Sequence, residues 1–167
     1  MNKTLQIELW KQFGAALDMF ENAITKCPPE LWDDDRKFWY TAFHTLFFLD
    51  YYLDTDPGDF KTYGPLKMTE SEIDEIMPER TLTRNELLAY LKHCRGKAHT
   101  LIAGFTEKTL SARWIDKYRN YGMYEMQFYN MRHVQHHTGQ LNLLLGRIDH
   151  NLPIWVSQTK VELNKKL

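Results

Sequence analysis

The chain has 167 residues, of which 43% are hydrophobic and 14% aromatic, and its formal net charge is −1 at pH 7. This composition fits one globular domain over residues 1–167 and argues against an intrinsically disordered chain. The balanced charge, without a basic stripe, argues against nucleic-acid binding. No apolar run reaches the roughly 18 residues that a membrane span needs, and the amino-terminal segment is too charged for a signal peptide, so we expect a cytoplasmic protein.

The apolar residues recur with helical spacing along almost the whole chain, which predicts an all-α protein. A first helix is expected over residues 3–26, ended by the two prolines at 28 and 29. A second helix is expected to start after Asp33–Asp35, whose carboxylates suit a helix N-terminus as caps and dipole partners, and to end near Leu53. Because apolar residues surround this helix, we expect it to be buried on most sides.

A long irregular connection is expected over residues 54–82, with a short helix near 70–77. Thr83 and Glu86 form a capping-box pattern, which predicts that a third helix begins there. A loop containing Trp114, without a strand, is expected before the fourth helix.

The fourth helix is expected to run from about Met123 to Arg147. The sequence therefore predicts a four-helix bundle with a long connection between the second and third helices. The helices are expected to bury stripes at Leu5, Leu9, Phe13, Ala16, Leu17, Phe20 and Ile24; at Leu87, Leu91, Cys94, Ala98, Leu101, Ile102 and Phe105; and at Met126, Met131, Val134, Leu141, Leu144, Leu145 and Ile148.

Histidines provide the most specific functional signal in the sequence. His133 and His137 are four residues apart on the fourth helix, so their side chains share one face and can bind one metal ion. His44 lies in the middle of the apolar second helix and is the best candidate for a third ligand. His136 points about 100° away from His137 and is not expected to join them. A pair of satisfied histidines without a metal remains the alternative.

Three further residues, Tyr51, Asn130 and Gln140, lie within one or two helical turns of these histidines and are expected to line a pocket. Other active-site chemistries lack their motifs. The chain has no Glu-x-x-His, HExxH, CxxC, GxxxxGK[ST] or GxSxG pattern.

The histidine within FWYTAFHTLFFLDYYL, together with the later segment HVQHHTGQLNLLL, resembles the DinB/YfiT-like superfamily of metal-binding four-helix bundles, whose late motif reads approximately HxxxHxGQ. The resemblance covers the chain in order and length. The family usually carries a basic residue where this chain has Thr138, so the charge of the pocket is expected to differ. The resemblance implies one divalent ion, zinc or nickel, held by His44, His133 and His137. It also implies a small-molecule substrate, a low-molecular-weight thiol cosubstrate in some members, and a homodimer.

Three neutral imidazoles leave the positive charge of the ion in place, so an open position acidifies a bound water or thiol. We therefore expect a metal-dependent transferase that activates a small thiol for attack on an electrophile. Cys27 ends the first helix and Cys94 falls on a core stripe, so neither is expected to be the nucleophile. A metal-dependent hydrolase remains open, although the nearest acidic residue, Asp50, does not share the face of His44. A non-catalytic metal or small-ligand binding bundle also remains open, and a fourth protein ligand would close its site.

Overall fold

The structure is a computed structural model that describes residues 3–66, 78, 80–148 and 152–163. It is mostly helical, as predicted, and adds one small two-stranded sheet. Four long helices lie close to the predicted ranges. They are α1 (Lys3–Lys26), α3 (Phe38–Tyr52), α5 (Arg84–Ala103) and α7 (Met123–Gly146). The short elements are α2 (Pro29–Trp32), the 3-10 helix η1 (Pro57–Asp59), α6 (Glu107–Ser111), β1 (Arg113–Ile115) and β2 (Asn120–Gly122).

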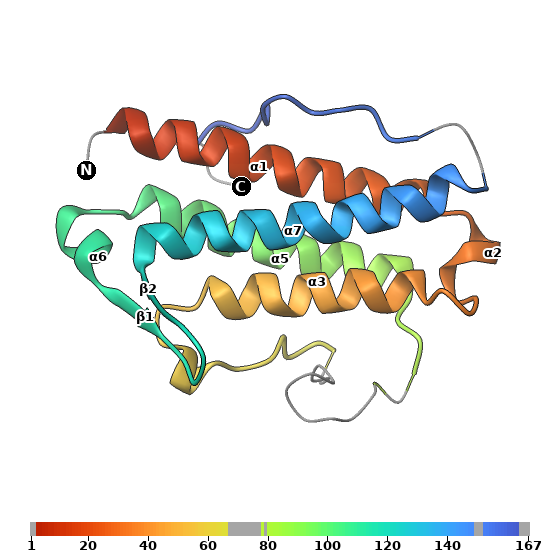
Figure 1. The fold of residues 1–167 in the computed structure, drawn as a ribbon, viewed down its shortest axis with the longest axis horizontal. Helices are drawn as coiled ribbons and strands as arrows, with labels where there is room; N and C mark the ends of the chain where they lie inside the picture. The colour runs from red at the N-terminus through yellow and green to blue at the C-terminus, as the bar shows by residue number, and fades with distance from the viewer. Residues whose placement is uncertain (1–2, 67–77, 79, 149–151, 164–167) are drawn as a thin grey trace.

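The four long helices lie side by side, and both α1 and α3 contact both α5 and α7 (Figure 1). Helices α1 and α7 run in one direction, whereas α3 and α5 run in the other (Figure 1). Because α3 and α5 point the same way, the chain must return along the molecule between them, which accounts for the long connection. The predicted short helix near 70–77 falls outside the described residues. Among the helices that the structure describes, none combines the length and apolarity needed to cross a membrane.

The start of α3 differs from the prediction, because the acidic residues do not cap it. The N-cap residue is Lys37, which has a φ of 51° and makes no side-chain cap hydrogen bond. The Asp33 carboxylate instead accepts a hydrogen bond from Trp39 Nε1 at 2.7 Å and one from the Thr81 hydroxyl at 2.6 Å. These bonds tie the start of α3 to the segment before α5. The prediction that α3 is buried on most sides is confirmed, because residues around its circumference are buried.

The capping box at the start of α5 is confirmed. The Thr83 hydroxyl accepts from the Glu86 backbone N–H at 3.3 Å, and Glu86 Oε2 accepts from the Thr83 N–H at 2.8 Å. The helix therefore begins where the sequence predicted, since both bonds are local.

The predicted core stripes are mostly buried, and the exceptions lie chiefly near helix ends. Leu5 is 45% exposed, and its neighbour Gln6 faces inward instead. The Gln6 amide donates hydrogen bonds to the Ala103 and Phe105 carbonyl oxygens at 3.2 and 2.8 Å. These carbonyls lie at the end of α5, where helical partners are lacking, so a polar side chain is favoured there over leucine. Ile148, beyond the end of α7, is 41% exposed, and Leu101, Met131 and Leu144 are only partly buried.

The segment predicted as a loop without a strand contains a hairpin. Residues of β1 pair antiparallel with those of β2, with Trp114 opposite Tyr121. The Trp114 side chain is fully buried, and its indole N–H donates to the Asp54 carbonyl oxygen at 2.9 Å. Asp116 organises the turn, because its Oδ1 accepts from the backbone N–H groups of Tyr118 and Arg119. The turn contains no Gly or Pro, so the sequence carries no standard turn signal.

The carboxy-terminal segment runs along α1 (Figure 1). The Thr159 backbone N–H donates to the Lys11 carbonyl oxygen at 3.1 Å, and the Trp10 indole donates to the Val161 carbonyl oxygen at 2.7 Å. Gly14 permits this close approach, because a Cβ there would lie 2.5 Å from the Thr159 methyl group.

Candidate metal centre

The three histidines predicted as ligands meet between α3 and α7. His44 comes from α3, and its ring centroid lies 4.7 Å from that of His137 and 5.5 Å from that of His133. One ring nitrogen of each histidine lies within 4.8 Å of the others. In the described part of the chain, neither a carboxylate nor a cysteine joins this group. His44, His133 and His137 can therefore hold a metal ion, whereas His136 lies outside the set.

The spacing of the ring nitrogens fits a shared ion. His133 Nε2 lies 3.1 Å from His137 Nε2. Two imidazole nitrogens at about 2.0–2.1 Å from one tetrahedral ion stand roughly 3.3 Å apart, so a small adjustment would suffice. The single turn between the two histidines on α7 sets this spacing, and packing of α3 against α7 adds His44.

The surroundings keep the two α7 histidines neutral. Burial and, to a smaller extent, neighbouring His137 and His44 together lower the pKa of His133 from 6.5 to about 3. Burial also lowers the pKa of His137, to about 4, against the hydrogen bond to Gln140, which raises it. Metal ions bind the neutral imidazole, so these rings have free lone pairs at neutral pH.

Gln140 orients the ring of His137, which agrees with its predicted place beside the ligands. Its Oε1 lies 2.7 Å from His137 Nδ1, and its Nε2 lies 3.3 Å from His136 Nε2. An amide oxygen can only accept, so His137 carries its proton on Nδ1 and leaves the Nε2 lone pair free. Metal-ligating histidines typically have such a partner on the other nitrogen.

The other two predicted pocket residues lie in different surroundings. Asn130 is fully buried one turn before His133, and its amide donates to the Leu49 carbonyl oxygen at 3.1 Å. Tyr51 packs against Trp114, and its hydroxyl donates to Asp116 Oδ2 at a long 3.5 Å. Asn130 therefore lies beside the histidines, whereas Tyr51 contacts the hairpin.

The hairpin brings a cation toward the site that the sequence did not reveal. The Arg119 guanidinium lies 5.3 Å from the ring centres of both Tyr52 and Tyr129, and pairs with Asp116 at 2.9 Å. The Tyr52 ring packs edge-on against His133 at 5.6 Å. The charge of Arg119 also contributes to the lowered pKa of His133. No local pattern predicts this placement, because it depends on the fold of the hairpin.

Thr138, where the family resemblance leads one to expect a basic residue, is buried and 1% exposed. Its hydroxyl donates to the Val134 carbonyl oxygen at 2.7 Å, one turn earlier on α7. The side chain is thus satisfied within the helix and contributes no charge.

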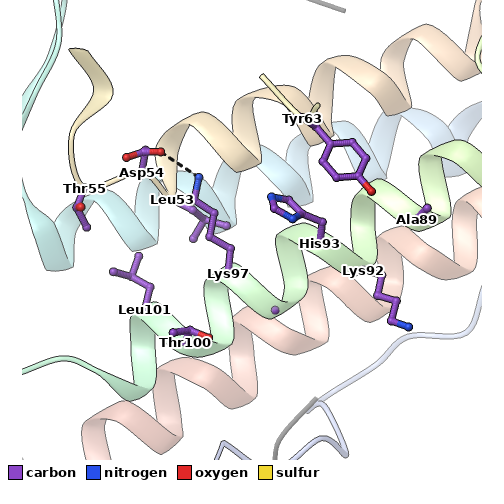
Figure 2. A pocket seen from close by; sticks show the side chains of 11 residues that line it. Leu53, Asp54, Thr55, Tyr63, Ala89, Lys92, His93, Lys97, Thr100 and Leu101 are labelled. Atoms are coloured by element: carbon purple, nitrogen blue, oxygen red, sulfur yellow. Dashed lines mark hydrogen bonds and ion pairs between the residues drawn. The ribbon is translucent and has the colours of Figure 1, made fainter. Parts of the chain in front are cut away.

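Apart from the histidines, a depression with a volume of about 840 Å³ lies on the α5 side of α3 (Figure 2). Figure 2 shows Lys97 bonded to Asp54, with His93 and Tyr63 beside them. The Lys97 ammonium also donates to Asp50 Oδ1 at 2.7 Å. The Lys97 ammonium is therefore paired with two carboxylates. The chemistry of three converging lone pairs weighs more than cavity size, so we place the candidate site at the histidines.

Neither a protein-family model, nor a curated protein, nor a solved structure matches the chain.

Proposed function

We propose that the chain is a metal-dependent transferase of the DinB/YfiT-like superfamily, which uses a small thiol cosubstrate to attack an electrophilic substrate. The observation that carries this proposal is the convergence of three histidines, without a carboxylate, between α3 and α7. A zinc or nickel ion held by three neutral ligands keeps its full charge and acidifies a thiol at an open position. The arrangement of four long helices, with one proposed ligand on α3 and two on α7, supports the assignment.

The thiol would come from outside the protein. Cys27 and Cys94 are both buried. Burial raises the pKa of Cys27 to about 12 and that of Cys94 well above its usual value. Because the thiolate is the nucleophilic form, neither side chain is suited to attack at neutral pH.

Two observations support a transferase over the alternatives. A hydrolase benefits from a general base, but Asp50 is buried on the α5 side and accepts bonds from Lys97 and Tyr90. A closed structural site needs a fourth protein ligand, and the described residues offer only three. An open three-histidine site is the arrangement that a catalytic metal needs.

Metal analysis of the purified protein, followed by cobalt substitution, tests the proposal. We expect one divalent ion per chain. Addition of a low-molecular-weight thiol to the cobalt protein should produce a sulfur-to-cobalt charge-transfer band, because the thiol would coordinate through sulfur. Binding should strengthen as pH rises, since coordination releases the thiol proton. The loaded protein should also transfer the thiol to a generic electrophile.

The control is the His137→Ala variant treated in the same way, which should give neither band nor transfer. If several thiols at millimolar concentration give neither signal with the wild-type protein, the transferase proposal is wrong. A non-catalytic metal site would then be the better interpretation.

A further inference from the structure

A depression along α7 shares a wall with the candidate metal centre. It has a volume of about 380 Å³, and it is lined by Tyr129, Arg132, His133, Gln135 and His136. Four of these residues recur at intervals of three or four, so they lie along one side of the helix. Because His133 belongs both to this lining and to the histidine cluster, a reactant bound at the cluster has room to extend along α7.

The lining carries one permanent charge, and it is positive. Arg132 contributes a guanidinium, and the lining residues that the structure describes include neither Asp nor Glu. Arg132 is exposed, and within the described part of the chain its side chain has no hydrogen bond or ion pair. Its guanidinium is therefore free to bind an external anion. Four other arginines already pair with carboxylates, namely Arg36, Arg80, Arg95 and Arg119.

Two neutral side chains add hydrogen-bond donors to the same lining. The Tyr129 hydroxyl oxygen accepts from Arg119 Nε and Nη2 at 3.3 and 3.2 Å, which holds it in place and leaves its O–H as a donor. The Gln135 amide nitrogen lies 4.0 Å from the Met19 sulfur, which is a weak acceptor. One unpaired cation with neutral donors beside it suits a singly charged group that offers only acceptors, which is the chemistry of a carboxylate.

We propose that this depression binds a carboxylate of one of the two reactants, and that Arg132 is the residue that recognises it. The inference rests on the proposed function and deepens it, because it names the substrate class: an organic acid that reacts at the metal ion through its other end. The paired N–H groups of a guanidinium match the two oxygens of a carboxylate, whereas a neutral amide of the same shape offers one oxygen and no charge.

A matched pair of thiols tests whether the thiol brings the carboxylate. The cobalt-loaded protein is titrated with 3-mercaptopropionate and with its neutral amide, and the charge-transfer band gives both affinities. The acid should bind about tenfold more tightly, as expected for one charged hydrogen-bonded contact. In Arg132→Gln the two thiols should bind equally, and Arg132→Lys should keep part of the preference. Arg147→Gln is the control, because Arg147 is also exposed but lies at the end of α7 outside the depression.

A matched pair of electrophiles tests the other reactant. With the neutral thiol 2-mercaptoethanol, the protein is given iodoacetate or iodoacetamide; a carbon–sulfur bond forms, iodide leaves, and the thiol proton passes to the buffer. The ratio of the two rates should fall about tenfold in Arg132→Gln and stay unchanged in Arg147→Gln. Comparison with the wild-type ratio removes the intrinsic difference between the reagents. Ratios that Arg132→Gln leaves unchanged in both pairs would overturn the inference, since a carboxylate that simply coordinates cobalt needs no arginine.

A readout without a thiol separates this inference from the transferase proposal. In zinc-loaded protein labelled with ¹⁵N, the Arg132 Nε–H signal should shift and saturate with propionate but not with propionamide. If this shift occurs although no thiol binds, the transferase proposal fails and the carboxylate site stands. If thiols bind but propionate gives no shift, the inference fails and the transferase proposal stands. Failure of the wild-type protein to bind any metal would overturn both.

Discussion

Acidification of the protein in the presence of a chelator tests the buried state of His133. Its pKa is lowered from 6.5 to about 3, mainly by burial. In the unfolded chain the same ring has a pKa of about 6.5, so between about pH 6.5 and about pH 3 the unfolded state binds a proton that the folded state excludes. The free energy of unfolding is therefore highest above this window and falls as the pH drops through it.

The magnitude follows from the width of the window. At about pH 5 the medium is about 1.5 units below the unfolded pKa, and each unit is worth about 1.36 kcal/mol, so His133 alone should cost about 2 kcal/mol of stability. The pKa of His137, lowered to about 4, shifts stability in the same direction. Its contribution should be smaller, because that ring is less buried and solvent screens it.

Urea unfolding at about pH 7.5 and at about pH 5, on the wild-type protein and on His133→Phe, isolates this contribution. The variant lacks the titrating ring, while carboxylates and the other histidines titrate in both proteins and largely cancel. We expect the wild-type protein to lose about 2 kcal/mol more than the variant. An equal loss in the two proteins would show that folding does not exclude a proton from His133, which would refute the burial argument.

Three further predictions concern the ligands, the carboxy-terminal segment and assembly. Alanine at any one of the three clustered histidines should remove most of the bound metal, whereas His136→Ala should retain it; loss of metal in the His136 variant would contradict the ligand set. Gly14→Ala should destabilise the protein by about 1–3 kcal/mol in urea unfolding, because the new Cβ would overlap the Thr159 methyl group; unchanged stability would show that the segment moves aside freely. We expect a homodimer, so light scattering at micromolar concentration should give twice the 20.0 kDa chain mass, and the single-chain mass would reject it.

The end of α1 and the start of α5 could be predicted because their signals are local. Pro28 and Pro29 end α1, and the two side-chain bonds that start α5 lie within four consecutive residues. The hairpin could not be predicted in this way. Its residue Trp114 is buried and donates to the carbonyl oxygen of Asp54, sixty residues earlier. Contacts over such separations leave no periodic pattern in the sequence.

For the candidate site, too, the local part could be predicted and the part that depends on packing could not. The spacing of His133 and His137 fixes their shared face, since a helix repeats about every 3.6 residues. His44 was a candidate because it interrupts an apolar helix, and only the packing of α3 against α7 brings it to the other two rings. The Gln140 amide oxygen faces His137 Nδ1, whereas the Asn130 amide donates to the Leu49 carbonyl oxygen of α3. The sequence could indicate that these residues lie near the histidines, but not which atoms they bond.

The buried helix α3 places its polar residues His44 and Asp50 in two different environments. Its sequence is apolar on all sides, which predicts burial but does not say where its few polar residues point. His44 faces α7 and the other histidines, whereas Asp50 faces α5, where it accepts from Lys97 at 2.7 Å and from Tyr90 at 3.1 Å. The helix thus keeps a carboxylate and an ammonium apart from the three neutral imidazoles. The Asp50 carboxylate would therefore not neutralise the charge of a metal ion bound at the histidines, because it faces α5 and pairs with Lys97.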